Sequence, residues 1–181
     1  AIGANKDSKS KYQQSKFMGE EKAINNFDKT VIIRPSVVIG NEDNFTNLFA
    51  KLSLSPIIPV VNTSYKFEPI FVNDVAKAIL KAIETKNNEG KIYELGGGRV
   101  ISFGDMIKLI LKLIGKKRIV ADVPMTLAKI QGSLLSLLPI DPVITKDQCI
   151  ILSEKDNVVS GDHLTLEDLN IKPSDIEKEM E

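Results

Sequence analysis

The chain has 181 residues, of which 43% are hydrophobic and 27% are charged, so its composition is ordinary for a globular protein with one sizeable core. The 24 basic residues balance the 24 acidic ones, so no net field attracts nucleic acid, and nucleic-acid binding is set aside. One cysteine, one histidine and no apolar run of membrane-spanning length exclude a disulfide framework, a multi-cysteine or multi-histidine metal site, a histidine-dependent triad and a transmembrane segment.

The first predicted element is a helix within residues 8–27, for which Ser8 and Ser10 offer capping hydroxyls. Tyr12 and Lys16 are four residues apart in it, so their side chains share one face. An ammonium beside a phenol favours the phenolate, which would make the pair a usable general acid and base. The alternative is a solvated contact on a surface helix, because a Tyr-x-x-x-Lys match arises often by chance in a lysine-rich chain.

A β-branched run at 30–35 predicts a strand that ends at Pro35, followed by a second apolar run at 36–40. A helix followed by a continuous apolar strand is typical of a parallel sheet that is buried on both faces. The loop after Pro35 should therefore open at the carboxyl edge of the sheet, where ligands bind in open α/β folds.

The next segments predict a helix, a connection and a second helix. Asp43 or Asn44 can cap a helix through Leu52 that lies on the core, and residues 57–61 read as a short apolar connection. Residues 66–76 should be a short strand or an extended stretch that runs into a helix capped by Asn73 or Asp74. The buried stripe of that helix is predicted to be apolar and consists of Val75, Ala76, Ile79, Leu80 and Ile83.

A strand is predicted at 91–95, closed by the glycine triplet 96–98, and a strongly apolar helix at 103–114. The triplet invites a phosphate-loop interpretation, but neither G-x-G-x-x-G spacing nor a P-loop lysine follows, so a tight strand-to-helix turn is favoured. Ser102 and Asp105 resemble a capping box for the helix, which needs cover on more than one side.

A strand at 117–123 leads into a helix at 125–138 that carries one charge. That helix is either core packing or a docking surface for a partner or a membrane face. Thr145 should cap a further helix to Leu152, residues 156–160 form a loop, and two small helices at 165–169 and 174–180 close the chain. His163 is expected in a surface loop.

Several motifs follow one another in a specific order: Tyr12-x-x-x-Lys16, Arg34-Pro35, the segment 67–76 and the segment 93–97. In this order they resemble the C-terminal half of an extended short-chain dehydrogenase/reductase. The segments 34–45, 144–148 and 156–160 are similar to bacterial relatives of the NAD(P)H-binding accessory subunit of respiratory complex I. The resemblance covers essentially the whole chain.

This resemblance implies an α/β Rossmann-type fold whose N-terminal half is missing. Residues 1–40 would end the nucleotide-binding domain, and residues 41–181 would form the C-terminal substrate subdomain, with one further Rossmann strand near 91–95. The family places a tyrosine and a lysine at the nicotinamide ribose and a proline near the nicotinamide, which correspond to Tyr12, Lys16 and Pro35 here. Ser36 and Val37 are their expected backbone or contact neighbours.

Two family features are not found in these residues. The G-x-x-G-x-x-G loop that holds the pyrophosphate is expected well before Ala1. The family's serine or threonine hydroxyl is expected at or just before the start, where residues 1–4 look like the tail of the strand that would carry it. The resemblance therefore implies NADP or NAD in the intact protein, with NADPH favoured, and no tightly bound cofactor in this fragment alone.

The first functional hypothesis is a complex-I-associated accessory or assembly subunit whose cofactor is mainly structural. The alternative is an active reductase, epimerase or dehydratase in which Tyr12 is the general acid and base. Expected partners are complex I subunits and the missing N-terminal half, and the fragment should self-associate. A lone cysteine suits a reducing compartment, so the expected location is cytoplasmic or peripheral on the inner face of the inner membrane.

Overall fold

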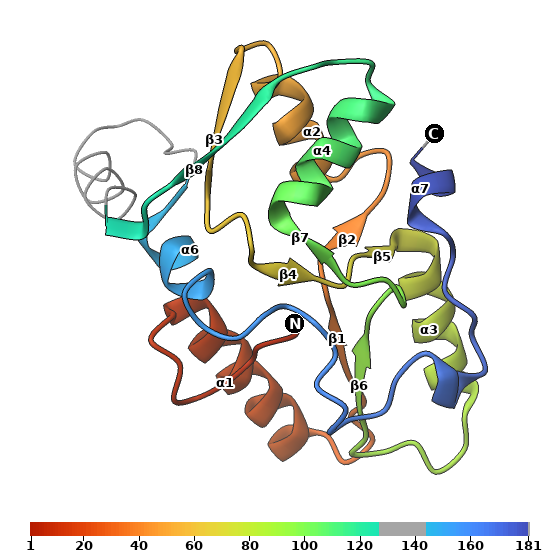
Figure 1. Ribbon diagram of the computed structural model, residues 1–181. Helices are drawn as coiled ribbons and strands as arrows, with labels where there is room; N and C mark the ends of the chain where they lie inside the picture. Colours follow the sequence, from red (N-terminus) through yellow and green to blue (C-terminus); the bar gives the residue numbers. More distant parts are fainter. Residues whose placement is uncertain (127–143, 181) are drawn as a thin grey trace.

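The computed structural model describes residues 1–126 and 144–180, which form an α/β fold of short strand pairs flanked by helices (Figure 1). Helix α1 (Lys11–Asn26) lies within the predicted range, and Ser10 caps it by accepting a hydrogen bond from the Gln13 N–H. Within the described ranges, no helix is both long and apolar enough to cross a membrane.

The strand pair nearest to α1 is parallel, as the sequence predicts. Strand β1 (Ile32–Pro35) pairs with β6 (Ile92–Leu95), and Pro35 lies opposite Leu95 at the carboxyl end. In Figure 1, α1 lies beside β1 and α3 (Val72–Glu84) lies beyond β6. The predicted end of β1 at Pro35 is confirmed, since proline cannot extend the ladder.

Helix α3 differs from the prediction in its start and in its buried face. It begins after Phe71, which makes no side-chain capping bond, and the Asp74 carboxylate instead accepts hydrogen bonds from Ser174 and Lys77. Its buried residues are Asp74, Ala78 and Ala82. The predicted stripe was wrong because small alanines let the helix approach closely, while the large aliphatic residues lie on its outer side. The exposed members are Ala76, Ile79, Leu80 and Ile83.

Two further strand pairs connect the segments after β1 to the rest of the molecule. Strand β2 (Val38–Ile39) pairs in parallel with β5 (Ile70–Phe71). Strand β4 (Lys66–Phe67) pairs antiparallel with β7 (Ile101–Ser102), so the predicted strand within 66–76 is split in two.

Residues 57–61 are a strand and not the connection that the sequence predicts. Strand β3 (Ile57–Val61) pairs in parallel with β8 (Ile119–Val123) over its full length. Pro59 is exposed, and among the described residues β3 has one strand partner, β8. The nitrogen of Pro59, which carries no hydrogen, can therefore face away from the ladder, so proline is tolerated there.

Helices α2 (Asn44–Leu52) and α4 (Phe103–Leu113) pack against each other beside these strands. Asp43 caps α2 and Ser102 caps α4, both as predicted. Phe45, Phe49 and Phe103 meet within 5.8 Å between ring centroids, which ties the two helices together. Helix α4 is covered on several sides, again as predicted.

The C-terminal region forms three short helical elements. Helix α6 (Lys146–Ile151) has the capping box Thr145/Gln148, η1 (Glu167–Leu169) is a single 3-10 turn, and α7 (Ile176–Glu179) is one short helix. The predicted helix at 125–138 lies outside the described residues after Thr126, so neither interpretation of it is decided.

Buried apolar side chains form two cores. The larger one gathers α2, α4, β3, β4 and Cys149, and the smaller one gathers β6, α3, η1 and Ile70. Ile33 of β1 packs against the smaller core and Val37, just after β1, packs against the larger one, so the Pro35 end of β1 lies where the two cores meet.

Candidate functional site

The first turn of α1 is held by a carboxylate from a distant helix. Asp147 of α6 accepts hydrogen bonds from the Ser10 hydroxyl at 2.7 Å and from the N–H groups of Lys11 at 2.8 Å and Tyr12 at 3.1 Å. Burial alone would raise the pKa of Asp147, but these hydrogen bonds outweigh it and hold the pKa below its ordinary value. Asp147 thus fixes the backbone of Tyr12 itself.

A second carboxylate supports the residues just before α1. Glu154 accepts hydrogen bonds from the Ser8 hydroxyl at 2.8 Å and from the Lys9 N–H at 3.0 Å. Ser8 and Ser10 are buried in this arrangement. Both serines therefore anchor the helix start, and sequence reasoning missed their acidic partners, which are more than 130 residues away in the chain.

Tyr12 and Lys16 lie on one face of α1, as their spacing predicts. The Lys16 Nζ atom is 5.3 Å from the centroid of the Tyr12 ring, within the range of a cation–π contact. The Tyr12 side chain is 46% exposed and Lys16 is also exposed, so a ligand can reach both.

Pro35, Ser36 and Val37 lie where β1 leaves its ladder. The Pro35 carbonyl accepts a hydrogen bond from the Ile2 N–H at 3.2 Å, and the Val37 carbonyl accepts one from the Ile70 N–H at 2.9 Å. Ser36 is buried, and its hydroxyl donates to Asn157, 2.6 Å from Oδ1. The Ser36 side chain is therefore engaged within the protein, and its backbone N–H donates to the Leu95 carbonyl at 3.0 Å.

One C-terminal stretch contacts both halves of this candidate site. Asp147 binds the start of α1, and Asn157, ten residues later, binds Ser36 and accepts the Glu68 N–H at 3.0 Å. Residues 147–157 therefore link the Tyr12 helix to the end of β1. The sequence singled out these C-terminal motifs only by resemblance, whereas their contacts give them a positioning role.

The glycine triplet at 96–98 connects β6 to β7, which precedes α4, so it is not the direct strand-to-helix turn that the sequence favours. The Glu68 carboxylate accepts the Gly98 N–H at 3.1 Å and the Val159 N–H at 3.1 Å. A Cβ at Gly96 would lie 2.3 Å from Glu68 Cδ. A side chain of the protein occupies the space in which a phosphate would have to sit, so the phosphate-loop alternative fails at this turn.

A buried ionic cluster below β1 was missed by sequence reasoning. Arg34 pairs with Glu20 of α1, with a closest distance of 2.6 Å, and lies 3.7 Å from Glu94 of β6. The Arg34 Nη1 atom is 3.0 Å from the His163 Nε2, which must accept because a guanidinium only donates. His163 lies in a loop, as predicted, but its ring is half-buried against Arg34 of β1.

The exposed side chains of the candidate site, Tyr12 and Lys16, can bind a sugar diol. An ammonium with three donors and a phenol that both donates and accepts fit the two neighbouring hydroxyls of a ribose. Among residues 1–126 and 144–180, no group of three or more His, Cys, Asp or Glu side chains could hold a metal ion. Tyr12 and Lys16 could therefore hydrogen-bond the hydroxyls of a ribose.

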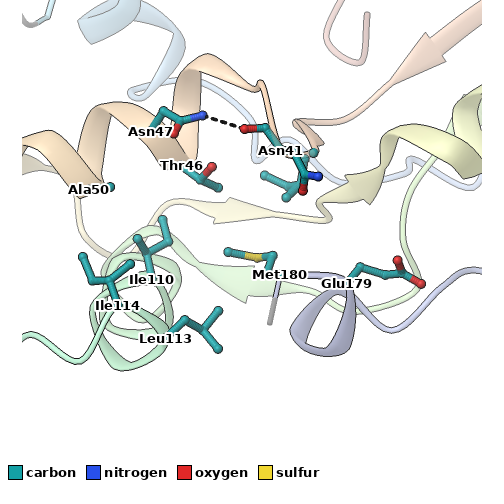
Figure 2. Close-up of a pocket in the computed structure, with 11 residues that line it drawn as sticks. Asn41, Thr46, Asn47, Ala50, Ile110, Leu113, Ile114, Glu179 and Met180 are labelled. Carbon is teal, nitrogen blue, oxygen red and sulfur yellow. Dashed lines mark hydrogen bonds between the residues drawn. The ribbon is translucent and has the colours of Figure 1, made fainter.

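A pocket of about 190 Å³ lies elsewhere, between α2, α4 and α7 (Figure 2). Its floor is aliphatic, with Ile110 and Leu113 from α4, and Met180 lies beside them. Asn47 closes its rim by donating a hydrogen bond to the Asn41 carbonyl at 3.2 Å. Tyr12, Lys16 and Pro35 do not line this pocket, so it is separate from the candidate site.

The RmlD substrate binding domain model matches residues 4–135. The chain belongs to this family. The match includes α1 with Tyr12 and Lys16, and β1 with Pro35.

Curated relatives of this RmlD-family chain are mitochondrial subunits of NADH dehydrogenase. It is 30% identical over 183 residues to NADH dehydrogenase [ubiquinone] 1 alpha subcomplex subunit 9 of Dictyostelium discoideum, covering 99% of this chain and 51% of the relative. The subunit of the same name from Mus musculus is 31% identical over 178 residues, covering 97% of this chain and 47% of the relative. The chain spans about half the length of these relatives, and the predicted resemblance is confirmed.

Solved structures share the fold of this RmlD-family chain. A nucleoside-diphosphate-sugar epimerase from Staphylococcus aureus has a TM-score of 0.70 at 12% identity, covering 98% of this chain and 61% of that one. A dTDP-4-dehydrorhamnose reductase from Bacillus anthracis, solved with NADP, has a TM-score of 0.57 at 21% identity, covering 77% of this chain and 52% of that one. The predicted α/β Rossmann-type fold is thereby confirmed.

Proposed function

We propose that the protein is an accessory or assembly subunit of NADH:ubiquinone oxidoreductase that holds NAD(P)H mainly as a structural cofactor. The observation that carries this proposal is the similarity to curated subunits of that enzyme, which extends over 97–99% of the chain. The proposal includes a cytoplasmic location or one peripheral on the inner face of the inner membrane.

In this proposal, Tyr12 and Lys16 bind the nicotinamide ribose, Pro35 lies near the nicotinamide, and Ser36 and Val37 contribute backbone contacts. The exposed Tyr12–Lys16 pair supports this assignment, because its donors suit a ribose diol. A bound nicotinamide supplies hydride chemistry when a substrate is present. The residues of this chain would bind and orient it, with NADPH favoured over NADH.

Association with the enzyme complex is tested by native gel electrophoresis of membranes from the source organism. The protein should co-migrate with NADH:ubiquinone oxidoreductase, and its deletion should lower the amount of assembled complex. Migration only as a free species, with normal complex in the deletion strain, would refute the proposal.

The cofactor site is tested by titrating the full-length protein with NADPH. Lys16→Ala should weaken binding by about tenfold, because a charge-assisted hydrogen bond to the ribose is lost. Lys22→Ala, which removes another lysine of the same helix, is the matched control and should leave the affinity unchanged. Equal affinities for all three proteins would refute the assignment of Lys16.

The alternative is an active reductase, epimerase or dehydratase with Tyr12 as general acid and base. The observation that favours it is the accessible Tyr12 ring with the Lys16 ammonium beside it. Under this alternative, Tyr12→Phe should lower turnover on the order of a hundredfold or more while keeping NADPH affinity. A wild-type protein without turnover on carbonyl and sugar-nucleotide substrates would remove it.

The 181 residues alone should bind NADPH weakly or not at all. The Glu68 side chain fills the space at Gly96. The described residues include candidates to bind the ribose, but no glycine-rich loop at a helix N-terminus to bind the pyrophosphate. Titration calorimetry on the isolated chain tests this, and submicromolar affinity would contradict it.

A further inference from the structure

Two loops meet at one end of the molecule and form what we call the cationic tip. One loop joins α2 to β3 and the other joins α4 to β8, and both lie at the upper end of Figure 1. The Arg118 Nε donates to the Ser53 carbonyl at 2.7 Å, and the Ile119 N–H donates to the Pro56 carbonyl at 3.1 Å, which fixes the loops side by side. The side chains of the tip are Lys51, Leu54, Ile57, Ile114, Lys116, Lys117, Arg118 and Ile119.

The charge of the tip has one sign. Neither of the two stretches that build it, residues 44–67 and 106–121, contains an aspartate or a glutamate. Lys51, Lys116 and Lys117 are exposed. The acidic group that α7 brings to these stretches is Glu177, which pairs with Lys112 of α4 at 2.8 Å, and Glu179 lines the same pocket as Ile114 but lies at its other end (Figure 2). The tip is strongly basic on a chain whose net charge is zero.

Large aliphatic side chains project among these lysines. Leu54 is 81% exposed and Ile119 is 64% exposed. Ile57 is the register partner of Ile119 and is also exposed, so the two side chains lie next to each other on the open side of the β3–β8 ladder. Ile114, at the end of α4, adds a fourth exposed apolar group. Clustered exposed apolar side chains mark interaction surfaces.

We propose that the cationic tip docks on the surface of a membrane that contains anionic lipids. Aliphatic side chains enter the boundary between headgroups and acyl chains, while lysine ammoniums on long stems reach the phosphates. The tip carries no aromatic side chain, and its one arginine is held by backbone carbonyls. Aromatic and arginine side chains dominate protein–protein hot spots, so a lipid surface is the better match.

This inference goes beyond the proposed function, because it needs neither a cofactor nor another subunit. It uses no residue of the candidate site. A protein that failed to co-migrate with NADH:ubiquinone oxidoreductase could still bind lipid, and a protein that co-migrated could fail to bind it, so the two experiments separate the proposals.

The test is co-sedimentation of the purified protein with vesicles of phosphatidylcholine alone or mixed with phosphatidylglycerol. The wild-type protein should bind the mixed vesicles, bind the neutral ones weakly, and be released by salt. Lys116→Glu with Lys117→Glu should lower the partition coefficient by about fivefold or more for each cation removed. Lys86→Glu with Lys172→Glu makes the same charge change at two exposed lysines outside the tip and should have little effect.

The apolar part of the proposal needs a second variant. Leu54→Ser with Ile119→Ser removes two exposed side chains, so the fold should stay intact, as circular dichroism would check, while the partition coefficient drops about tenfold or more. Failure of the wild-type protein to co-sediment with the anionic vesicles would overturn the proposal. Tip variants that bind the vesicles as well as the lysine control would also overturn it. If such variants bind lipid normally but no longer co-migrate with the enzyme complex, the tip is a protein contact.

Discussion

A single carboxylate, Asp147, holds the start of α1 and therefore the position of Tyr12. Its two oxygens accept three hydrogen bonds from consecutive residues of that turn. Asp147→Ala should lower the free energy of unfolding by about 2 kcal/mol, because a charged cap and its hydrogen bonds are lost together. Urea denaturation measures this. Asp28→Ala removes an exposed carboxylate from the turn after α1 and should change it by less than about 0.5 kcal/mol.

Asp74 makes stability depend on pH. Burial alone would raise its pKa, but hydrogen bonds from Ser174 and Lys77 outweigh burial and keep the pKa below its ordinary value. The pKa of Asp74 is lower in the folded state than in the unfolded state, where it is about 4. Its contribution to the free energy of unfolding is therefore present above the unfolded-state pKa and is lost as the pH falls through the folded-state pKa. Asp74→Asn should cost about 1 to 2 kcal/mol at neutral pH.

The same variant should flatten the acid limb of the stability curve, since asparagine does not titrate. Chemical denaturation between neutral pH and about pH 2 compares the two proteins. Asp162→Asn changes an exposed loop aspartate and should keep the wild-type slope. An Asp74→Asn protein that loses as much stability as wild type on acidification would contradict the role assigned to Asp74.

Among the elements, the turn between β6 and β7 leaves the least room. A Cβ at Gly97 would lie 2.0 Å from the Pro69 carbonyl oxygen, a backbone atom that cannot rotate away. Gly97→Ala should therefore destabilise the protein by about 3 kcal/mol or more, and thermal unfolding would show it. The control has the opposite sign: Gly19 is inside α1 with nothing within 4 Å of its Cβ position, so Gly19→Ala should stabilise by up to about 1 kcal/mol.

The elements that sequence reasoning predicts well are those with local signals. Ser10, Asp43 and Thr145 cap their helices as expected, and Pro35 ends β1, because capping and proline geometry depend on neighbours in the chain. The buried face of α3 was wrong for a long-range reason. Hydrophobicity ranks Leu80 above Ala78, but the close approach of α3 to its core admits the smaller side chain.

In the candidate site, too, features that depend on neighbours in the chain could be predicted, and those that depend on distant residues could not. The pairing of Tyr12 with Lys16 follows from helical spacing and could be predicted. The supports of the site come from residues far along the chain, such as Asp147 at Tyr12 and Asn157 at Ser36, and no local pattern predicts these contacts. In the sequence itself, those segments are distinguished only by their resemblance to a family.

At the scale of the whole molecule, helices and strands of both cores are tied together by the C-terminal stretch. Asn157 bonds to Ser36 and to backbone groups of Lys66 and Glu68, while Ser174 bonds to Asp74 of α3. A stretch that reaches both cores couples their unfolding. It follows that substitutions at Asp147 or Asp74, although remote from each other in sequence, should both act on global stability.

The outer face of α3 leads to a prediction about assembly. Leu80 is 63% exposed and Ile83 is 77% exposed, and Ile83 also lines an adjoining pocket of about 350 Å³ with Val31 and Ile33. Burying such side chains stabilises association by about 1 to 2 kcal/mol each. The isolated 181-residue chain should therefore self-associate through α3, and its sedimentation coefficient should rise with concentration.

Leu80→Glu with Ile83→Glu should return the isolated chain to a monomer, because two carboxylates would have to be desolvated at the contact. Val100→Glu is the matched control, since it places the same charge at an exposed apolar residue outside α3 and should leave association intact. A wild-type chain that stays monomeric at all concentrations would contradict the prediction. If the chain still associates with the α3 substitutions but not with Val100→Glu, the contact lies at the loop before β7 and not at α3.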